Sequence, residues 1–121
     1  MSLGKLADDI LKSENVNVSA LNIIFCSDEF IRDHNKRFLG HDYETDIITF
    51  HDTEEEGRIE GELLISIDTV KSNATKYKTT LNNELRRVVI HGILHLCGYN
   101  DKTHAEKKQI RKKEDHFLNN K

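Results

Sequence analysis

The stretch from His91 to Asp101 constrains this chain more than any other part of it. Two histidines, His91 and His95, lie four residues apart inside an apolar run that favours a helix. This spacing places both imidazoles on one helix face, with their Cβ atoms about 5–6 Å apart, so one ion can accept a nitrogen from each ring. The same spacing also occurs where a histidine is a hydrogen-bonded core residue, so spacing alone leaves a metal site and simple packing both open.

Residues just beyond the second histidine favour the metal interpretation. Gly98 is predicted to end the helix, because glycine readily takes the left-handed conformation that a reversal of the chain needs. The chain then turns back and carries Asp101 and His104 towards the same ion, and either could be the third ligand. Three protein ligands leave one tetrahedral position open, which is typical of a catalytic metal rather than a structural one.

The residue after the first histidine bears on the type of hydrolase. In the metalloprotease motif a glutamate at this position is the general base, whereas here the position is Gly92, which cannot transfer a proton. Peptide hydrolysis by that mechanism is therefore disfavoured. Cys97 points to a different side of the helix from His95 and is a poor ligand, so Cys97 and the distant Cys26 are expected to be free thiols in a reducing cytoplasm.

The length and charge of the chain limit its class. A chain of 121 residues is expected to form one domain, residues 1–121, with a core that needs no disulfide. There is no run of eighteen apolar residues, so no membrane-spanning segment and no membrane partner are expected. A net charge of −3 argues against a protein that binds nucleic acid by overall charge, so any contact with RNA must be local or supplied by a partner.

The pattern of apolar residues predicts an α+β fold, with a small mixed β-sheet packed by helices and a metzincin-like metal helix that ends in a glycine turn. Because strand, helix and strand follow one another, strands 21–26 and 45–50 are predicted to pair in parallel, and strand 61–67 is predicted to run antiparallel to the strand before it. The helices are predicted over 3–11, from the N-cap Ser27 to the break at Gly40, over 68–77 with Asp68 as cap, over 82–97 and over 103–118.

The eleven-residue pattern at the metal helix resembles the signature of the YbeY family, H-G-x-L-H-L-x-G-Y-D-H. Its third histidine is replaced here by Asp101, whose carboxylate binds zinc at a similar distance, about 2.0–2.2 Å. Since Asp101 stands at the matched position, it is preferred to His104 as the third ligand. The resemblance thus implies one Zn²⁺ per chain, held by His91, His95 and Asp101. The matching positions are His91, Gly92, Leu94, His95, Leu96, Gly98 and Tyr99.

A second region of resemblance precedes the metal helix. Residues 35–50 are similar to the family's N-x-x-Y-R-x-K-D-x-P-T-D-V-L-S-F, and residues 61–66 are similar to G-D-I-x-I-S. The family arginine is Leu39 here and its proline is Glu44, so a bidentate phosphate donor is lost. Either Arg37 or His41 replaces it, or phosphate binding is weaker. Thr45 and Asp46 are expected either to line the cleft or to form a hydrogen-bonded strand entry.

What the resemblance implies is a cytoplasmic, metal-dependent, single-strand-specific endoribonuclease. It would act in late maturation of ribosomal RNA at the 3′ end of 16S RNA and in ribosome quality control, with ribosomal RNA or a ribosomal particle as partner and no DNA. The alternatives are a non-catalytic ribosome-assembly factor with a structural metal, another metal-dependent hydrolase, and a metal-free helical interaction domain. The acceptors that would orient the ligand histidines cannot be named from the sequence.

Overall fold

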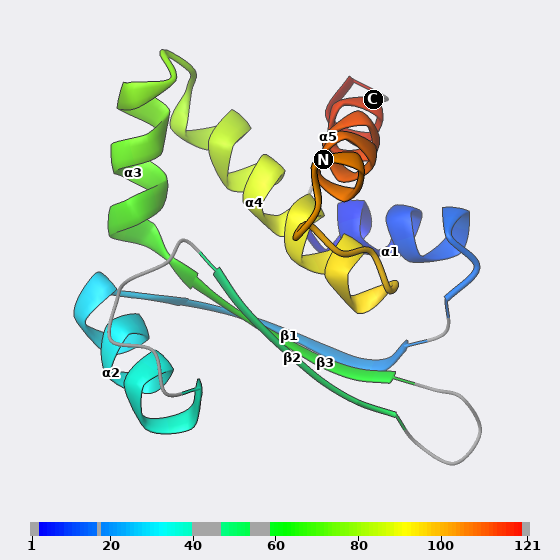
Figure 1. Ribbon diagram of the computed structural model, residues 1–121, viewed down its shortest axis with the longest axis horizontal. Coiled ribbons are helices and arrows are strands. Elements are labelled where there is room, and N and C mark those ends of the chain that lie inside the picture. Colours follow the sequence, from blue (N-terminus) through cyan, green and yellow to red (C-terminus); the bar gives the residue numbers. More distant parts are fainter. Residues whose placement is uncertain (1–2, 17, 40–46, 54–58, 120–121) are drawn as a thin grey trace.

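The computed structural model describes residues 3–16, 18–39, 47–53 and 59–119. Within these ranges the elements follow the predicted order of helices and strands closely (Figure 1). The helices are α1 (Leu3–Ser13), α2 (Asp28–Leu39), α3 (Ile67–Lys76), α4 (Leu81–Leu96) and α5 (His104–Asn119). The strands are β1 (Val18–Cys26), β2 (Ile47–Thr53) and β3 (Ile59–Ser66).

The three strands form a mixed sheet in the order β1-β3-β2. β2 and β3 are antiparallel, which confirms that part of the prediction. The predicted parallel pairing of strands 21–26 and 45–50 is wrong, because β3 lies between them and is itself the parallel partner of β1. In this sheet β3, rather than β2, lies next to β1. No local pattern in the sequence specifies which strand of the antiparallel pair β2–β3 becomes the neighbour of β1.

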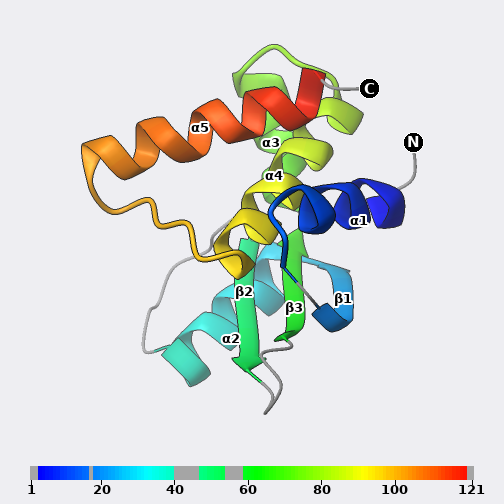
Figure 2. The same ribbon diagram turned by 90° about the vertical axis from the view of Figure 1, so that its right-hand side faces the viewer.

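The helices cover both faces of this sheet. α4 packs on one face and is surrounded by α1, α3 and α5, whereas α2 lies on the opposite face (Figures 1 and 2). The central strand β3 is buried on both sides: Leu63 and Ile65 belong to the core beneath α4, and Leu64 packs with Ile31 of α2. None of the described helices is both long and apolar enough to cross a bilayer.

Two helices begin together where the parallel strands end. Ser27 caps α2 as predicted, because its hydroxyl accepts a backbone N–H from the first turn at 3.1 Å. The prediction that Asp68 caps α3 is wrong: the cap is Ser66, two residues earlier, whose hydroxyl accepts from the backbone N of Thr69 at 3.1 Å. Asp68 instead accepts the backbone N–H of Asp28 at 3.0 Å and joins the two helix starts.

Candidate metal centre

Helix α4 brings the two histidines together. The hydroxyl of Thr80 caps the helix by accepting from the backbone N of Asn83 at 3.0 Å, and sixteen residues later the helix ends at Leu96. The Nε2 atoms of His91 and His95 lie 2.9 Å apart. The sequence therefore predicted correctly that both rings share one face of this helix.

A glycine turn follows α4 and reverses the chain. Gly98 has φ of +100°, a conformation that side-chain-bearing residues rarely adopt. Its N–H donates to the carbonyl of His95 at 3.0 Å, and the N–H of Tyr99 donates to the carbonyl of Leu94 at 3.1 Å. These bonds satisfy carbonyls at the end of the helix and aim the following residues back at the histidines.

Asp101 completes a cluster of three ligand atoms. Its Oδ2 atom lies 3.3 Å from Nε2 of His91 and 3.5 Å from Nε2 of His95. All three side chains are partly buried, and the cluster could hold a metal ion. His104 is the first residue of α5, is exposed, and is not part of this cluster.

The spacing of these atoms fits a tetrahedral divalent ion. With ligand distances of roughly 2.0–2.1 Å, two ligand atoms of a tetrahedral zinc site lie about 3.3–3.4 Å apart. The separations of 2.9, 3.3 and 3.5 Å bracket that value. Ring nitrogens and a carboxylate oxygen are also the donors that zinc prefers, so the side chains present suit the ion that the sequence predicted.

Glu114 of α5 orients the first histidine, a contact that was not predicted from the sequence. Its Oε2 lies 2.8 Å from Nδ1 of His91, and the residue is only 6% exposed. An Nδ1–H that donates to this carboxylate leaves the lone pair of Nε2 directed at the cluster. The signal in the sequence was a glutamate on an otherwise apolar helix face, since Ile110, Glu114 and Phe117 are buried at helical spacing.

Arg87 balances the charge of this buried carboxylate. It lies one turn before His91 on α4, and its Nη1 is 3.2 Å from Oε1 of Glu114. Its Nε lies 3.8 Å from Oε1 of Glu84, and its Nη2 lies 3.5 Å from Oδ1 of Asp115. The arginine therefore links helices α4 and α5 next to the three candidate ligands.

A cleft of about 520 Å³ opens beside the cluster, between α3, α4 and α5. His91 and Asp101 line one part of it, so the candidate metal centre is accessible from this side. Two cations of α5, Lys107 and Arg111, also face the cleft. The remaining polar lining comes from α3, α4, the segment between them and α5. It consists of Asn73, Tyr77, Thr79, Asn83, Glu84, Arg87 and Glu114.

Other residues singled out in the sequence do not join the cluster or are not placed. Burial, followed by the nearby carboxylate of Glu14, raises the pKa of the Cys97 thiol to about 11, so the thiol stays protonated and is a poor ligand. His41, Glu44, Thr45 and Asp46 lie outside the described residues. For Arg37 and Leu39 the structure describes only the backbone, in the last turn of α2.

The sequence of this chain is similar to those of known proteins. A family model described as endoribonuclease YbeY matches residues 2–121. A protein of Cytophaga hutchinsonii named Endoribonuclease YbeY is 53% identical over 109 residues, which are 90% of this chain and 76% of that protein. A protein of the same name from Porphyromonas gingivalis strain ATCC 33277 is 45% identical over 116 residues, which are 96% of this chain and 76% of that protein.

A solved structure also resembles this chain. The solution structure of TM1509 from Thermotoga maritima superposes with a TM-score of 0.68 at 34% sequence identity. The match covers 96% of this chain and 76% of that one. The chain therefore spans about three-quarters of the length of each of these three relatives.

Proposed function

Because the chain belongs to the endoribonuclease YbeY family, we propose that it is a metal-dependent endoribonuclease that hydrolyses phosphodiester bonds in RNA. The observation that carries the proposal is the convergence of His91, His95 and Asp101 beside a cleft that His91 and Asp101 line. A site that brings three metal-ligand atoms to an accessible surface suits chemistry on a substrate from solution.

The metal is zinc, one ion per chain, held by Nε2 of His91, Nε2 of His95 and a carboxylate oxygen of Asp101. When bound, the ion supplies Lewis-acid polarisation of the phosphoryl group and of the attacking water. Three ligands from the described part of the chain match the number in catalytic zinc sites, whereas a structural site is closed by four. This difference favours an enzyme over a ribosome-assembly factor with a structural metal.

The protein's own residues hold the ligands in place. The carboxylate of Glu114 accepts a hydrogen bond from Nδ1–H of His91. This contact fixes the ring so that Nε2 faces the cluster. Arg87 donates to the same carboxylate and compensates for its burial. Lys107 and Arg111 supply positive charge beside the site, where the substrate phosphates approach.

The substrate is single-stranded ribosomal RNA, cut at the 3′ end of 16S RNA during late maturation and ribosome quality control in the cytoplasm. The family supports an RNA substrate. The free thiols Cys26 and Cys97 suit a reducing compartment such as the cytoplasm. The net charge of the chain is −3. An acidic protein binds RNA through a local basic site rather than through its overall charge. We propose no DNA substrate and no membrane partner.

The test is cleavage of an end-labelled single-stranded RNA carrying the 3′ end of 16S RNA, with zinc-loaded protein. We expect internal cleavage that stops on chelation and returns on addition of zinc. His95→Ala, purified in parallel, should lose at least 99% of the rate, whereas a contaminating ribonuclease would remain in that sample. Equal cleavage by His95→Ala and by the unaltered chain would contradict the proposal, as would no cleavage by fully loaded protein.

A further inference from the structure

We propose that the cleft between α3, α4 and α5 is a subsite that binds a single-stranded RNA segment next to the metal centre. Lys107 and Arg111 contact its phosphate, and Tyr77 stacks on a base. The inference rests on the proposed function, since it assigns where that substrate lies beyond the cleaved bond. The chain has a net charge of −3, so no overall positive charge attracts RNA, and binding of RNA depends on a local site such as this one.

The cleft is continuous with the metal centre along α4. Asn83, Arg87 and His91 all line it and follow one another at intervals of four residues, so they form one row on that helix. Across the cleft, Lys107 and Arg111 form a matching row on α5. A molecule bound in the cleft therefore reaches His91, the candidate metal-binding histidine, at one end of the cleft.

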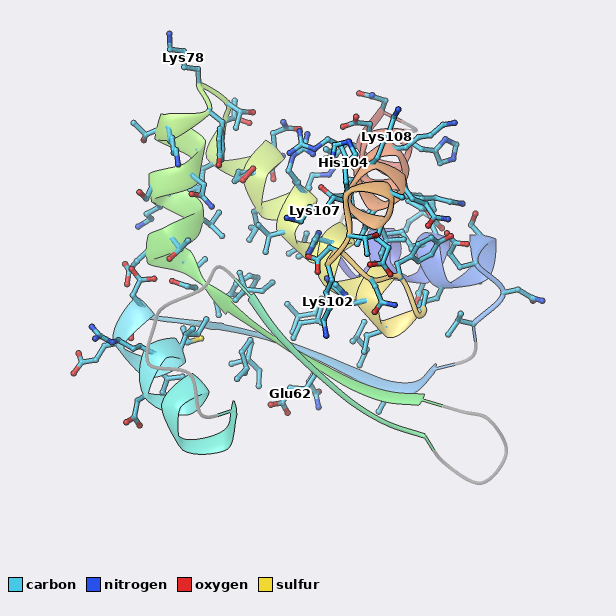
Figure 3. The ribbon with its side chains drawn as sticks, viewed as in Figure 1. Glu62, Lys78, Lys102, His104, Lys107 and Lys108 are labelled. Atoms are coloured by element: carbon cyan, nitrogen blue, oxygen red, sulfur yellow. The ribbon has the colours of Figure 1, made fainter. Side chains whose placement is uncertain are left out.

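The positive charge available to a ligand comes from α5. The charge of Arg87 is already balanced by Glu84 and Glu114. Lys107 and Arg111 are exposed, and no ion pair of theirs is found among the described residues. Figure 3 shows Lys107 on the side of α5 that faces α4, whereas Lys108 points to a different side. Two unneutralised cations one turn apart are suited to a phosphate group.

Tyr77 supplies an aromatic surface at the far part of the cleft. It follows the last residue of α3, it lines the cleft, and it is 61% exposed. Its ring has no role in the core, and one of its contacts is with the ammonium of Lys76, 5.4 Å from the ring centroid. Exposed aromatic rings combined with cations are the feature by which proteins bind single strands, whose unpaired bases can stack.

The size of the cleft favours a single strand. A volume of about 520 Å³ falls in the range of pockets for small ligands, about 300–1,000 Å³. It accommodates a nucleotide and its phosphate, but not a duplex, whose bases are stacked inside and unavailable to Tyr77. The amides of Asn73 and Asn83 on the cleft wall add donors and acceptors for a base edge or a ribose.

The first test measures binding by fluorescence anisotropy, with zinc-loaded protein and a labelled single-stranded 2′-O-methyl phosphorothioate oligonucleotide that resists cleavage. We expect Lys107→Ala/Arg111→Ala to raise Kd about tenfold or more and to reduce the slope of log K against log salt by about 0.7, as for loss of one phosphate contact on a single strand. The matched control is Lys108→Ala/Lys112→Ala, which removes the same charge from residues of α5 that do not line the cleft. Its Kd should rise less than threefold; equal effects of the two double variants would overturn the proposal.

The second test addresses the stacked base. Tyr77→Ala should raise Kd about fivefold or more, whereas Tyr77→Phe, which keeps the ring, should bind within twofold of the unaltered chain. With an oligonucleotide of abasic sites the three proteins should bind equally. If Tyr77→Ala binds the base-containing strand as well as Tyr77→Phe does, the stacking role is wrong. Thermal melting of each variant checks that the exposed substitution leaves the fold intact.

These binding results separate the subsite from the activity. If zinc-loaded protein cleaves RNA while Lys107→Ala/Arg111→Ala binds normally, the enzyme stands and the subsite is overturned. If binding depends on Lys107, Arg111 and Tyr77 but no cleavage occurs, the subsite stands and the proposed endoribonuclease activity is wrong.

Discussion

The Nδ1 atom of His91 lies 2.8 Å from Oε2 of Glu114, a carboxylate on the next helix that also accepts from Arg87. The two residues are 23 positions apart in the chain, and their contact fixes the first ligand ring from behind. A buried carboxylate paired with a histidine in this way sets the tautomer and raises the basicity of the nitrogen that faces a metal. Helix α5 thereby supports the candidate metal centre although none of its residues belongs to the cluster of three.

Removing this carboxylate should weaken metal binding. We expect Glu114→Ala to lower zinc affinity by about 10- to 100-fold, because His91 loses its acceptor. Glu114→Gln should lower zinc affinity less, since the amide oxygen can still accept a hydrogen bond from Nδ1–H of His91. Competition with a chromophoric chelator measures both. Asp115→Asn is the control: Asp115 is exposed and pairs with the other side of Arg87. A zinc affinity of Glu114→Ala equal to that of this control would show that the contact does not support the site.

The carboxylate at position 101 should set the pH dependence of the activity. With two neutral imidazoles and one carboxylate, a bound Zn²⁺ leaves a net charge of about +1, whereas three imidazoles leave about +2. Asp101→His should therefore move the rising limb of the pH–rate profile to lower pH, because greater positive charge favours loss of a proton from the attacking water. Rates measured between pH 5.5 and 9 test this. A limb that stays in place or moves to higher pH would show that this charge does not govern the reaction.

Local features of the sequence predicted the elements of the site. The spacing of His91 and His95 is a property of one helix, and the φ of +100° at Gly98 follows from the only residue type that adopts it readily. Whether Asp101 ligates a metal stays a prediction, but the turn does bring its carboxylate to the two rings. These features depend on residues within a dozen positions of one another, where the backbone limits the alternatives.

Long-range features were not predicted. The insertion of β3 between β1 and β2 and the contact of Glu114 with His91 both depend on how elements pack. Periodicity shows which face of a helix is apolar, but it does not show which side chain of another helix lies opposite. The cap of α3 was misplaced by the same cause, because Asp68 serves the neighbouring helix start at Asp28 rather than its own helix.

The start of α5, which positions Glu114, should respond to acid. Thr103 and Glu106 form a capping box: the backbone N of Thr103 donates to Oε1 of Glu106 at 2.9 Å, and the backbone N of Glu106 donates to the threonine hydroxyl at 3.1 Å. The hydrogen bond from the Thr103 backbone holds the pKa of Glu106 below its ordinary value of 4.5. A lowered folded-state pKa contributes stability above the ordinary pKa, and that stability is lost as pH falls through the lowered value.

Urea unfolding between pH 2.5 and 6.5 tests this sign. The unaltered chain should exceed Glu106→Gln in stability at pH 6, and the difference should shrink as the pH falls below about 4.5, because only the glutamate titrates. Thr103→Ala should lower stability by about 1 kcal/mol through loss of the cap. A difference between the unaltered chain and Glu106→Gln that is constant over the whole pH range would show that this carboxylate does not contribute through its charge.

The glycine that ends α4 should be costly to replace. An added Cβ at Gly98 meets nothing within 4 Å, so the cost of Gly98→Ala comes from the backbone conformation, about 1–2 kcal/mol of unfolding free energy. Gly4→Ala is the matched control: its Cβ also meets nothing within 4 Å, but Gly4 lies within α1, where alanine should stabilise by roughly 0.5–1 kcal/mol. Since the turn at Gly98 aims Asp101 at the histidines, we also expect zinc affinity to fall in Gly98→Ala and to stay unchanged in Gly4→Ala. Equal stability and zinc affinity in the two variants would show that the left-handed turn is not needed for the site.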